Sequence, residues 1–141
     1  MIIAPASGLR VVLDTNVYFS AFTHPRGVPF RIWRMAVDRR YVLVVSPTIL
    51  REMAGVLREV VLWREAEIVA HLKLVVRVAE IVTPAIDLRV IAEDPSDDRI
   101  LECALAGAAD LIVSGDRHLR KLKSFRNIAI VQPTDLLRAL G

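Results

Sequence analysis

Short aliphatic runs that alternate with stretches of helical periodicity are the feature that most constrains how this chain can fold. Hydrophobic residues make up 54% of the 141 residues but aromatic residues only 6%, so the core must be mainly aliphatic. Such runs are typical of strands buried under helices on both faces of a sheet. We predict strands at Arg10–Leu13, Tyr41–Val45, Leu111–Val113 and Ile128–Val131.

Helices are predicted between these strands. Ser46-Pro47 is typical of a helix start, with serine as cap and proline in the first turn. The other helices are expected at Pro29–Val37, Glu65–Glu80, from Asp97 to about Ala108, from Arg117, and at Pro133–Leu140, while 81–82 and 88–91 stay ambiguous. Alternation of strands and helices implies right-handed crossovers. We therefore predict an α/β fold, a three-layer α/β/α sandwich with a central, mainly parallel sheet, and a single domain over residues 1–141.

Composition and charge exclude several classes of protein. The single cysteine, Cys103, excludes an internal disulfide and argues against a thiolate metal site. The longest apolar runs fall far short of the roughly 18 residues that span a bilayer, and 1–9 lacks the pattern of a secretory signal. We expect a cytoplasmic protein without a membrane partner. Sixteen of the 19 basic residues are arginine, which suits nucleic acid, although genome composition or a solvated surface would also explain the bias.

Acidic residues fall where strands are predicted to end. Asp14 directly follows the first strand, and Asp116 follows Ser114-Gly115 after the strand at 111–113. In a parallel sheet, ligands bind beyond the carboxyl ends of the strands. Asp97 and Asp98 begin a helix, and Glu52 lies at the border of the apolar stripe of its own helix. Together these acids predict one acidic site at one edge of the sheet.

Each acid also has a simpler explanation. Asp14-Thr15-Asn16 could form only a turn, because Asp and Asn bond to their own backbone. Asp97 and Asp98 could be there to stabilise a helix amino terminus. Glu52 could form an ordinary ion pair.

A cluster of carboxylates has a definite chemistry. Several carboxylates within a few ångströms cannot all be ionised without a cation. All-oxygen ligands select hard ions, so Mg²⁺ or Mn²⁺ is expected, and the corresponding reaction is hydrolysis of a phosphodiester. Competing motifs are absent from the sequence: it has no glycine-rich phosphate loop with a lysine, no G-x-S-x-G elbow and no zinc-ligand spacing among His24, His71 and His118. Cys103 is predicted to be a core residue rather than a nucleophile.

Four segments resemble the motifs of the PIN-domain ribonucleases in order and spacing. They are Val12-Leu13-Asp14-Thr15-Asn16-Val17, Ser46-Pro47-Thr48 leading to Glu52, Asp94-Pro95-Ser96-Asp97-Asp98 with Leu101 and Ala104, and Ser114-Gly115-Asp116. The branch that the chain most resembles contains VapC-like toxins of toxin–antitoxin systems. The resemblance implies a metal-dependent endoribonuclease that is commonly a homodimer, acts on RNA and is neutralised by a small antitoxin protein.

The resemblance also implies roles for individual residues. Asp14, Glu52, Asp98 and Asp116 would be catalytic metal ligands for Mg²⁺ or Mn²⁺. Thr15, Asn16, Ser114 and Asp97 would support them, and Asp97 remains the alternative third ligand. Many relatives carry a further acid two residues beyond the last aspartate, where this chain has His118, which puts a second metal in doubt. Two other functions stay open: a PIN nuclease that processes RNA without being a toxin, and a PIN-like module that binds RNA or protein without cleaving.

Overall fold

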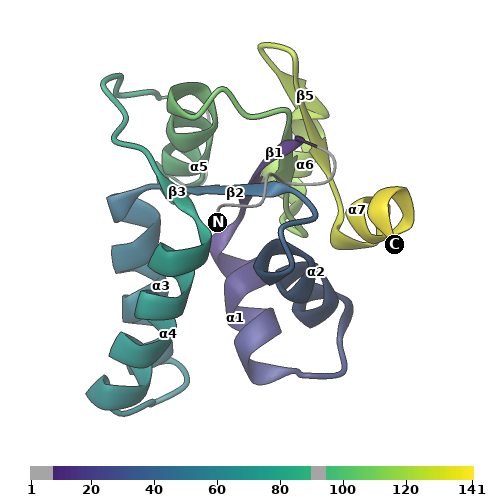
Figure 1. Cartoon of the computed structure of the whole chain (residues 1–141). Coiled ribbons are helices and arrows are strands. Elements are labelled where there is room, and N and C mark those ends of the chain that lie inside the picture. The colour runs from purple at the N-terminus through teal and green to yellow at the C-terminus, as the bar shows by residue number, and fades with distance from the viewer. Residues whose placement is uncertain (1–7, 90–94) are drawn as a thin grey trace.

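The centre of the molecule is a twisted sheet with helices on both faces (Figure 1). The computed structural model describes residues 8–89 and 95–141. Within these residues the sheet has six strands in the order β3-β2-β1-β4-β6-β5. The strands are β1 (Arg10–Leu13), β2 (Val42–Val45), β3 (Glu80–Ile81), β4 (Leu111–Val113), β5 (Ser124–Phe125) and β6 (Ile128–Val131). All neighbours pair in parallel except β5 and β6, so the prediction of an α/β sandwich around a mainly parallel sheet is confirmed.

The described helices begin largely where the sequence places their caps. They are α1 (Thr15–Thr23), α2 (Val28–Val37), α3 (Pro47–Glu59), α4 (Glu65–Val78), α5 (Pro95–Ala106), α6 (Arg117–Leu122) and α7 (Pro133–Leu140). The hydroxyl of Ser46 accepts a hydrogen bond from the backbone N–H of Ile49 at 3.2 Å, as expected of a helix cap. α4 ends two residues before the predicted Glu80, because Glu80 pairs with β2 as part of β3.

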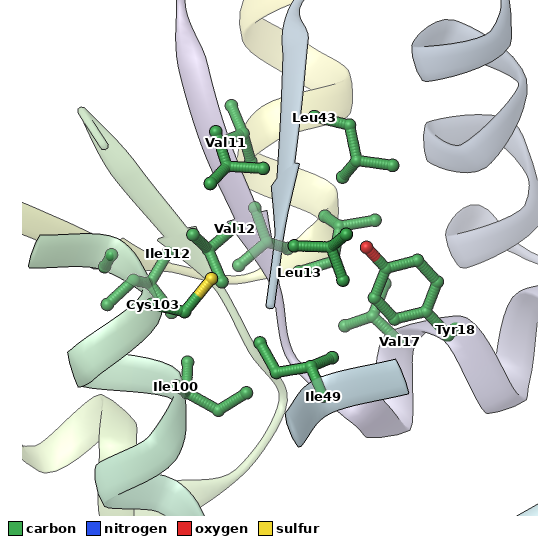
Figure 2. Packing of buried hydrophobic residues seen from close by; sticks show 14 of the residues in the cluster. Val11, Val12, Leu13, Val17, Tyr18, Leu43, Ile49, Ile100, Cys103 and Ile112 are labelled. Carbon is green, nitrogen blue, oxygen red and sulfur yellow. The ribbon is translucent and has the colours of Figure 1, made fainter. Parts of the chain in front are cut away.

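Three elements were not predicted: α1, the short antiparallel strand β5, and β3, where the sequence left 81–82 ambiguous. α1 contains β-branched and aromatic residues that have modest helix propensity. Tertiary packing offsets this weakness, because Val17 and Tyr18 are buried against the sheet. Figure 2 shows Tyr18 on the same side of the sheet as Leu43 of β2, while Ile112 of β4 lies beside Cys103 of α5 on the other side.

The strand order places a topological switch point between β1 and β4. From β1 the chain crosses to β2 on one side, whereas from β4 it continues to β6 on the other side. The two connections leave the carboxyl edge of the sheet in opposite directions, and ligands of open α/β sheets bind at such a point. Asp14 and Ser114 immediately follow these two strands. Across residues 8–89 and 95–141, no helix combines the length and apolar character that a membrane crossing requires.

The turn after α5 approaches β2 so closely that it requires a glycine. A Cβ built on Gly107 would lie 2.4 Å from Cγ1 of Val44, which is fully buried. The carbonyl of Gly107 also accepts a hydrogen bond from Nε of Arg10 at 2.7 Å, which ties this turn to β1. The close approach therefore holds α5 against the strand that precedes Asp14.

We expect Gly107→Ala to destabilise the protein by about 1–3 kcal/mol, the usual cost of overpacking a core. The matched control is Gly55→Ala in α3, where an added Cβ meets nothing within 4 Å. That change should raise stability by about 0.5–1 kcal/mol, because alanine favours a helix over glycine. Urea unfolding midpoints measure both effects, and equal midpoints for Gly107→Ala and the parent would contradict the close contact.

Candidate functional site

Asp14 joins the carboxyl ends of β1 and β4. Its backbone N–H donates a hydrogen bond to the carbonyl of Val113 at 2.9 Å, which extends the pairing of the two strands by one residue. Asp14 occupies the N-cap position of α1, but its side chain makes no capping hydrogen bond. Instead, its Oδ2 accepts a hydrogen bond from the hydroxyl of Ser114 at 2.7 Å. The side chain thus reaches across the switch point to the neighbouring strand, which a simple turn residue would not do.

Ser114 links Asp14 to Asp116. The Ser114 side chain is fully buried, and its Oγ accepts a hydrogen bond from the backbone N–H of Asp116 at 2.9 Å. Oδ1 of Asp116 in turn accepts hydrogen bonds from the N–H groups of His118 and Leu119, at 2.7 and 3.4 Å, and so caps α6. We call Asp14 and Asp116 the carboxylate pair.

The environment of Asp14 disfavours an isolated negative charge. Burial raises the pKa of the Asp14 carboxyl above its ordinary value, and the charge of Asp116 adds to this effect, while the Ser114 hydroxyl and the backbone of Thr15 and Asn16 act to lower the pKa. Only 5% of Asp14 is exposed. A buried carboxylate beside a second carboxylate is stabilised by a proton or by a cation.

The residue that follows Asp14 carries a further buried oxygen. The hydroxyl Oγ1 of Thr15 is buried and has no hydrogen-bond partner in the described part of the chain. A buried hydroxyl without a partner is costly, and a ligand or an ordered water usually satisfies it. Asn16 is exposed at the start of the same helix. Oxygen donors of this kind match the ligands that Mg²⁺ and Mn²⁺ prefer.

The remaining predicted ligands lie on α3 and α5. Asp97 and Asp98 are buried in the first turn of α5, with 4% and 3% of each residue exposed. Glu52 is half-buried on α3, at the edge of the apolar face formed by Ile49, Met53 and Leu57, as its helical angle predicts. The helix α5 packs against β1, β2 and β4 and also contacts α3. These contacts place both helices beside the strands that carry the pair.

The described residues do not by themselves form a complete metal cluster. Among residues 8–89 and 95–141, no group of three or more His, Cys, Asp or Glu side chains is arranged to hold a metal ion. The structure therefore joins Asp14 with Asp116 through Ser114, but it does not bring Glu52, Asp97 or Asp98 into one group with them. Asp94, the first residue of the third motif, lies outside the described residues.

The other residues considered from the sequence have clear surroundings. Cys103 is fully buried, and burial raises the pKa of its thiol to about 12, which confirms that it is a core residue. His24 is exposed, whereas His71 packs its ring against Phe22 and Trp63. His118 is half-buried, and its ring Nδ1 is buried without a hydrogen bond in the described part of the molecule.

A charged network behind α5 was missed in the sequence. Glu102 is buried and accepts hydrogen bonds from the N–H of Leu88 at 2.7 Å and from Arg99 at 2.9 Å. Arg99 also binds Asp87 at 3.0 Å and the carbonyl of Leu88 at 2.7 Å. The network ties the segment after β3 to the helix that carries Asp97 and Asp98. The Arg–Glu spacing of three residues was its only signal in the sequence.

Comparison with known proteins identifies the family. The model of the PIN domain family matches residues 10–118, which include all the predicted ligands. This chain belongs to the PIN domain family. An uncharacterized protein from Methanocaldococcus jannaschii is 30% identical over 137 residues, covering 89% of this chain and 86% of the relative.

Two solved structures share the PIN fold. One is VapBC2 from Rickettsia felis bound to a DNA fragment from their promoter. It has a TM-score of 0.63 and 15% identity, and the match covers 88% of this chain and 98% of that one. The other is a protein from Pyrobaculum aerophilum with a TM-score of 0.57 and 20% identity, covering 96% and 91% of the two chains. At these identities the likeness concerns the fold.

The burial of Asp14 predicts an effect on stability. Because the folded-state pKa of Asp14 is raised, its contribution to stability is present below the ordinary value of 3.8 and is lost as the pH rises through the folded-state pKa. At pH 7 burial of the Asp14 carboxyl therefore opposes folding of the metal-free protein. We expect metal-free Asp14→Asn to be at least as stable as the parent, while Mg²⁺ or Mn²⁺ should raise the melting temperature of the parent much more than that of the variant.

Asp110→Asn is the control. The Asp110 carboxylate accepts a hydrogen bond from the backbone N–H of Arg10 at 2.9 Å and is not a predicted metal ligand. Its melting temperature should fall slightly or stay unchanged, and it should keep the full metal response. Thermal melts at pH 7, with chelator and with excess metal, make the comparison. A strong loss of stability in Asp14→Asn, with no metal response in the parent, would show that Asp14 is only a structural residue.

Proposed function

We propose that this PIN domain is a metal-dependent endoribonuclease that acts in the cytoplasm as the toxin of a toxin–antitoxin pair. The observation that carries the proposal is the carboxylate pair at the switch point, held together by the buried hydroxyl of Ser114 at 2.7 Å from Asp14. A scaffold role alone does not explain why Asp14 is buried next to a second carboxylate.

The residues fit a hard divalent cation. Asp14 and Asp116 would hold Mg²⁺ or Mn²⁺, and Glu52 and Asp98 would supply further ligands from α3 and α5. When bound, the ion would supply a Lewis acid for phosphodiester hydrolysis. Ser114 orients the Asp14 carboxylate by donating a hydrogen bond to it, and the Ser114 hydroxyl is itself oriented by a hydrogen bond from the N–H of Asp116. Asp97, Thr15 and Asn16 would support these ligands.

The toxin role rests on family and on likeness of fold. One similar structure is VapBC2, whose name refers to two protein components. By analogy, the partner of this chain would be a small antitoxin protein, and the chain itself would form a homodimer. A non-toxin RNA-processing nuclease shares the chemistry but not the antitoxin. A module that binds without cleaving has neither the cleavage chemistry nor the antitoxin. The two experiments below distinguish these three functions.

The first experiment measures cleavage of unstructured RNA. Purified protein should cleave it with Mg²⁺ or Mn²⁺, and chelation should stop the reaction. Asp116→Asn is the sharpest variant, because asparagine caps a helix as well as aspartate does but removes one charge and one ligand. We expect it to lose at least about a hundredfold in rate while α6 stays intact, since even outer-shell changes at metal sites cost up to about this factor.

Glu52→Gln and Asp98→Asn should cause comparable losses, and Asp97→Asn a smaller one, whereas Asp110→Asn should retain activity. A larger loss of activity in Asp97→Asn than in Asp98→Asn would assign the third metal ligand to Asp97 and the supporting role to Asp98. Cleavage that survives chelation, or that Asp116→Asn leaves unchanged, would overturn the proposed mechanism. No cleavage across a broad panel of RNAs would favour the module that binds without cleaving.

The second experiment tests the toxin role. Induced expression in a bacterial host should arrest growth, and Asp14→Ala should relieve the arrest because it removes a metal ligand. Equal arrest by both forms at equal protein level would mean that the effect is independent of the site. Cleavage in vitro without any arrest would favour the RNA-processing alternative.

A further inference from the structure

An arginine-lined groove lies between α2, the turn before it and the end of α7. Its volume is about 580 Å³, and its basic lining consists of Arg26, Arg31, Arg34 and Arg40. Half-buried Phe30 and Leu137 form part of its apolar floor. The groove exists because α2 and α7 pack against each other, side by side on one face of the sheet (Figure 1). We call it the arginine groove.

Three of these arginines have no charged or hydrogen-bonded partner among the residues that the structure describes. Arg26, Arg31 and Arg34 are exposed, and none of them makes a salt bridge or side-chain hydrogen bond within the described residues. Arg31 and Arg34 are three residues apart on α2 and so share one face of that helix. Like charges at this spacing repel each other weakly, and an anion bound between them would relieve this repulsion.

The acidic residues at the end of α2 and on α7 form no salt bridge with the arginines of the groove in the described part of the chain. Asp135 of α7 pairs with Arg138 at 3.6 Å. Asp38, at the end of α2, is exposed and forms no salt bridge in the described structure. Arg40 donates a hydrogen bond to the carbonyl of Leu140, so its guanidinium is fixed at one end of the groove. The groove therefore presents several fixed or free guanidinium groups to solvent.

The groove is separate from the carboxylate pair. Arg40 precedes the start of β2, whereas Asp14 follows the end of β1, and these two strands are parallel neighbours. The two residues thus belong to opposite ends of the sheet. None of the described residues that line the groove is a predicted metal ligand. A chain that reached both places would have to extend well beyond the bond being cleaved.

We propose that the arginine groove binds the phosphate backbone of single-stranded RNA, in a stretch of substrate remote from the cleaved bond. Guanidinium groups form paired hydrogen bonds with phosphate, and half-buried Phe30, which lines the groove, offers an aromatic ring on which a base can stack. We assign RNA to the groove on the basis of the proposed nuclease function, because the carboxylates of an acidic peptide could also pair with these arginines. The groove then makes catalysis depend on substrate length.

The test compares two double variants of equal charge. Arg31→Gln with Arg34→Gln removes two groove charges, and Lys73→Gln with Arg77→Gln removes two exposed charges from one face of α4. Binding of fluorescent oligouridylate is measured by anisotropy in chelator, where no cleavage is expected. We expect the groove variant to bind on the order of tenfold more weakly at 0.1 M salt, and its log–log salt slope to fall by about 1.4, because each lost phosphate contact contributes about 0.7. The α4 control should bind as the parent does.

Cleavage kinetics provide the second readout. For long RNA the groove variant should raise KM and leave kcat unchanged, because the groove does not touch the reacting bond. For an RNA too short to span from the pair to the groove, the parent and the groove variant should behave alike. Thermal melts establish that both double variants are folded, as expected for exposed side chains.

The outcomes separate this proposal from the proposed function. Unchanged RNA binding and an unchanged salt slope in the groove variant would overturn the groove proposal even if the protein cleaves RNA. Weaker RNA binding in the groove variant, with no cleavage by any form, would support the groove and count against the nuclease. Displacement of RNA by polyglutamate at lower concentration than by unlabelled oligouridylate would assign the groove to an acidic protein partner instead.

Discussion

The pairing of β1 with β4 is the constraint on which the candidate site depends. Their parallel register carries the chain from Leu13 and Val113 directly into Asp14 and Ser114, and the N–H of Asp14 continues the ladder by one bond of 2.9 Å. A slip of one residue would send Asp14 to the opposite face, because side chains alternate along a strand. The buried aliphatic residues on both sides of the two strands fix that register, so the core determines where the chemistry can lie.

The same geometry creates a conflict that only a ligand resolves well. Folding buries Asp14 next to a second carboxylate and supplies a single side-chain donor, Ser114, to compensate. Stability alone would favour a neutral residue at this position, since burying an incompletely paired charge is costly. Positions at which the rules of stability are broken are often functional. The unsatisfied hydroxyl of Thr15 belongs to the same pattern, because it adds a polar atom where the core could have been apolar.

Much of the fold could be predicted from local pattern, because β1, β2, β4 and β6 are aliphatic runs and α3 carries its Ser-Pro start. What could not be predicted depends on contacts between distant residues. The helix α1 owes its existence to the burial of Val17 and Tyr18 rather than to propensity. The strand β5 has only two residues, too few for any periodicity. For the site, the locations of Asp14 and Asp116 after strand ends correctly predicted that the two residues lie near each other. The capping role of Asp116 and the hydrogen-bond network around Glu102 could be seen only in the structure.

Under the proposed function, the separation of opposite charges would explain how a chain of net charge +3 acts on a polyanionic substrate. A buried acidic edge repels phosphate until a cation neutralises it, so the acids alone cannot hold a nucleic acid. Arginines placed next to that edge would form salt bridges with the carboxylates and compete with the metal. Arginines in the groove between α2 and α7 would avoid this competition and would still attract the substrate, although screening limits their reach to about 10 Å at 0.1 M salt. If the proposed function and the groove proposal both hold, attraction in the groove and chemistry at the carboxylate pair require a substrate long enough to contact both, and the domain would then select its RNA by length.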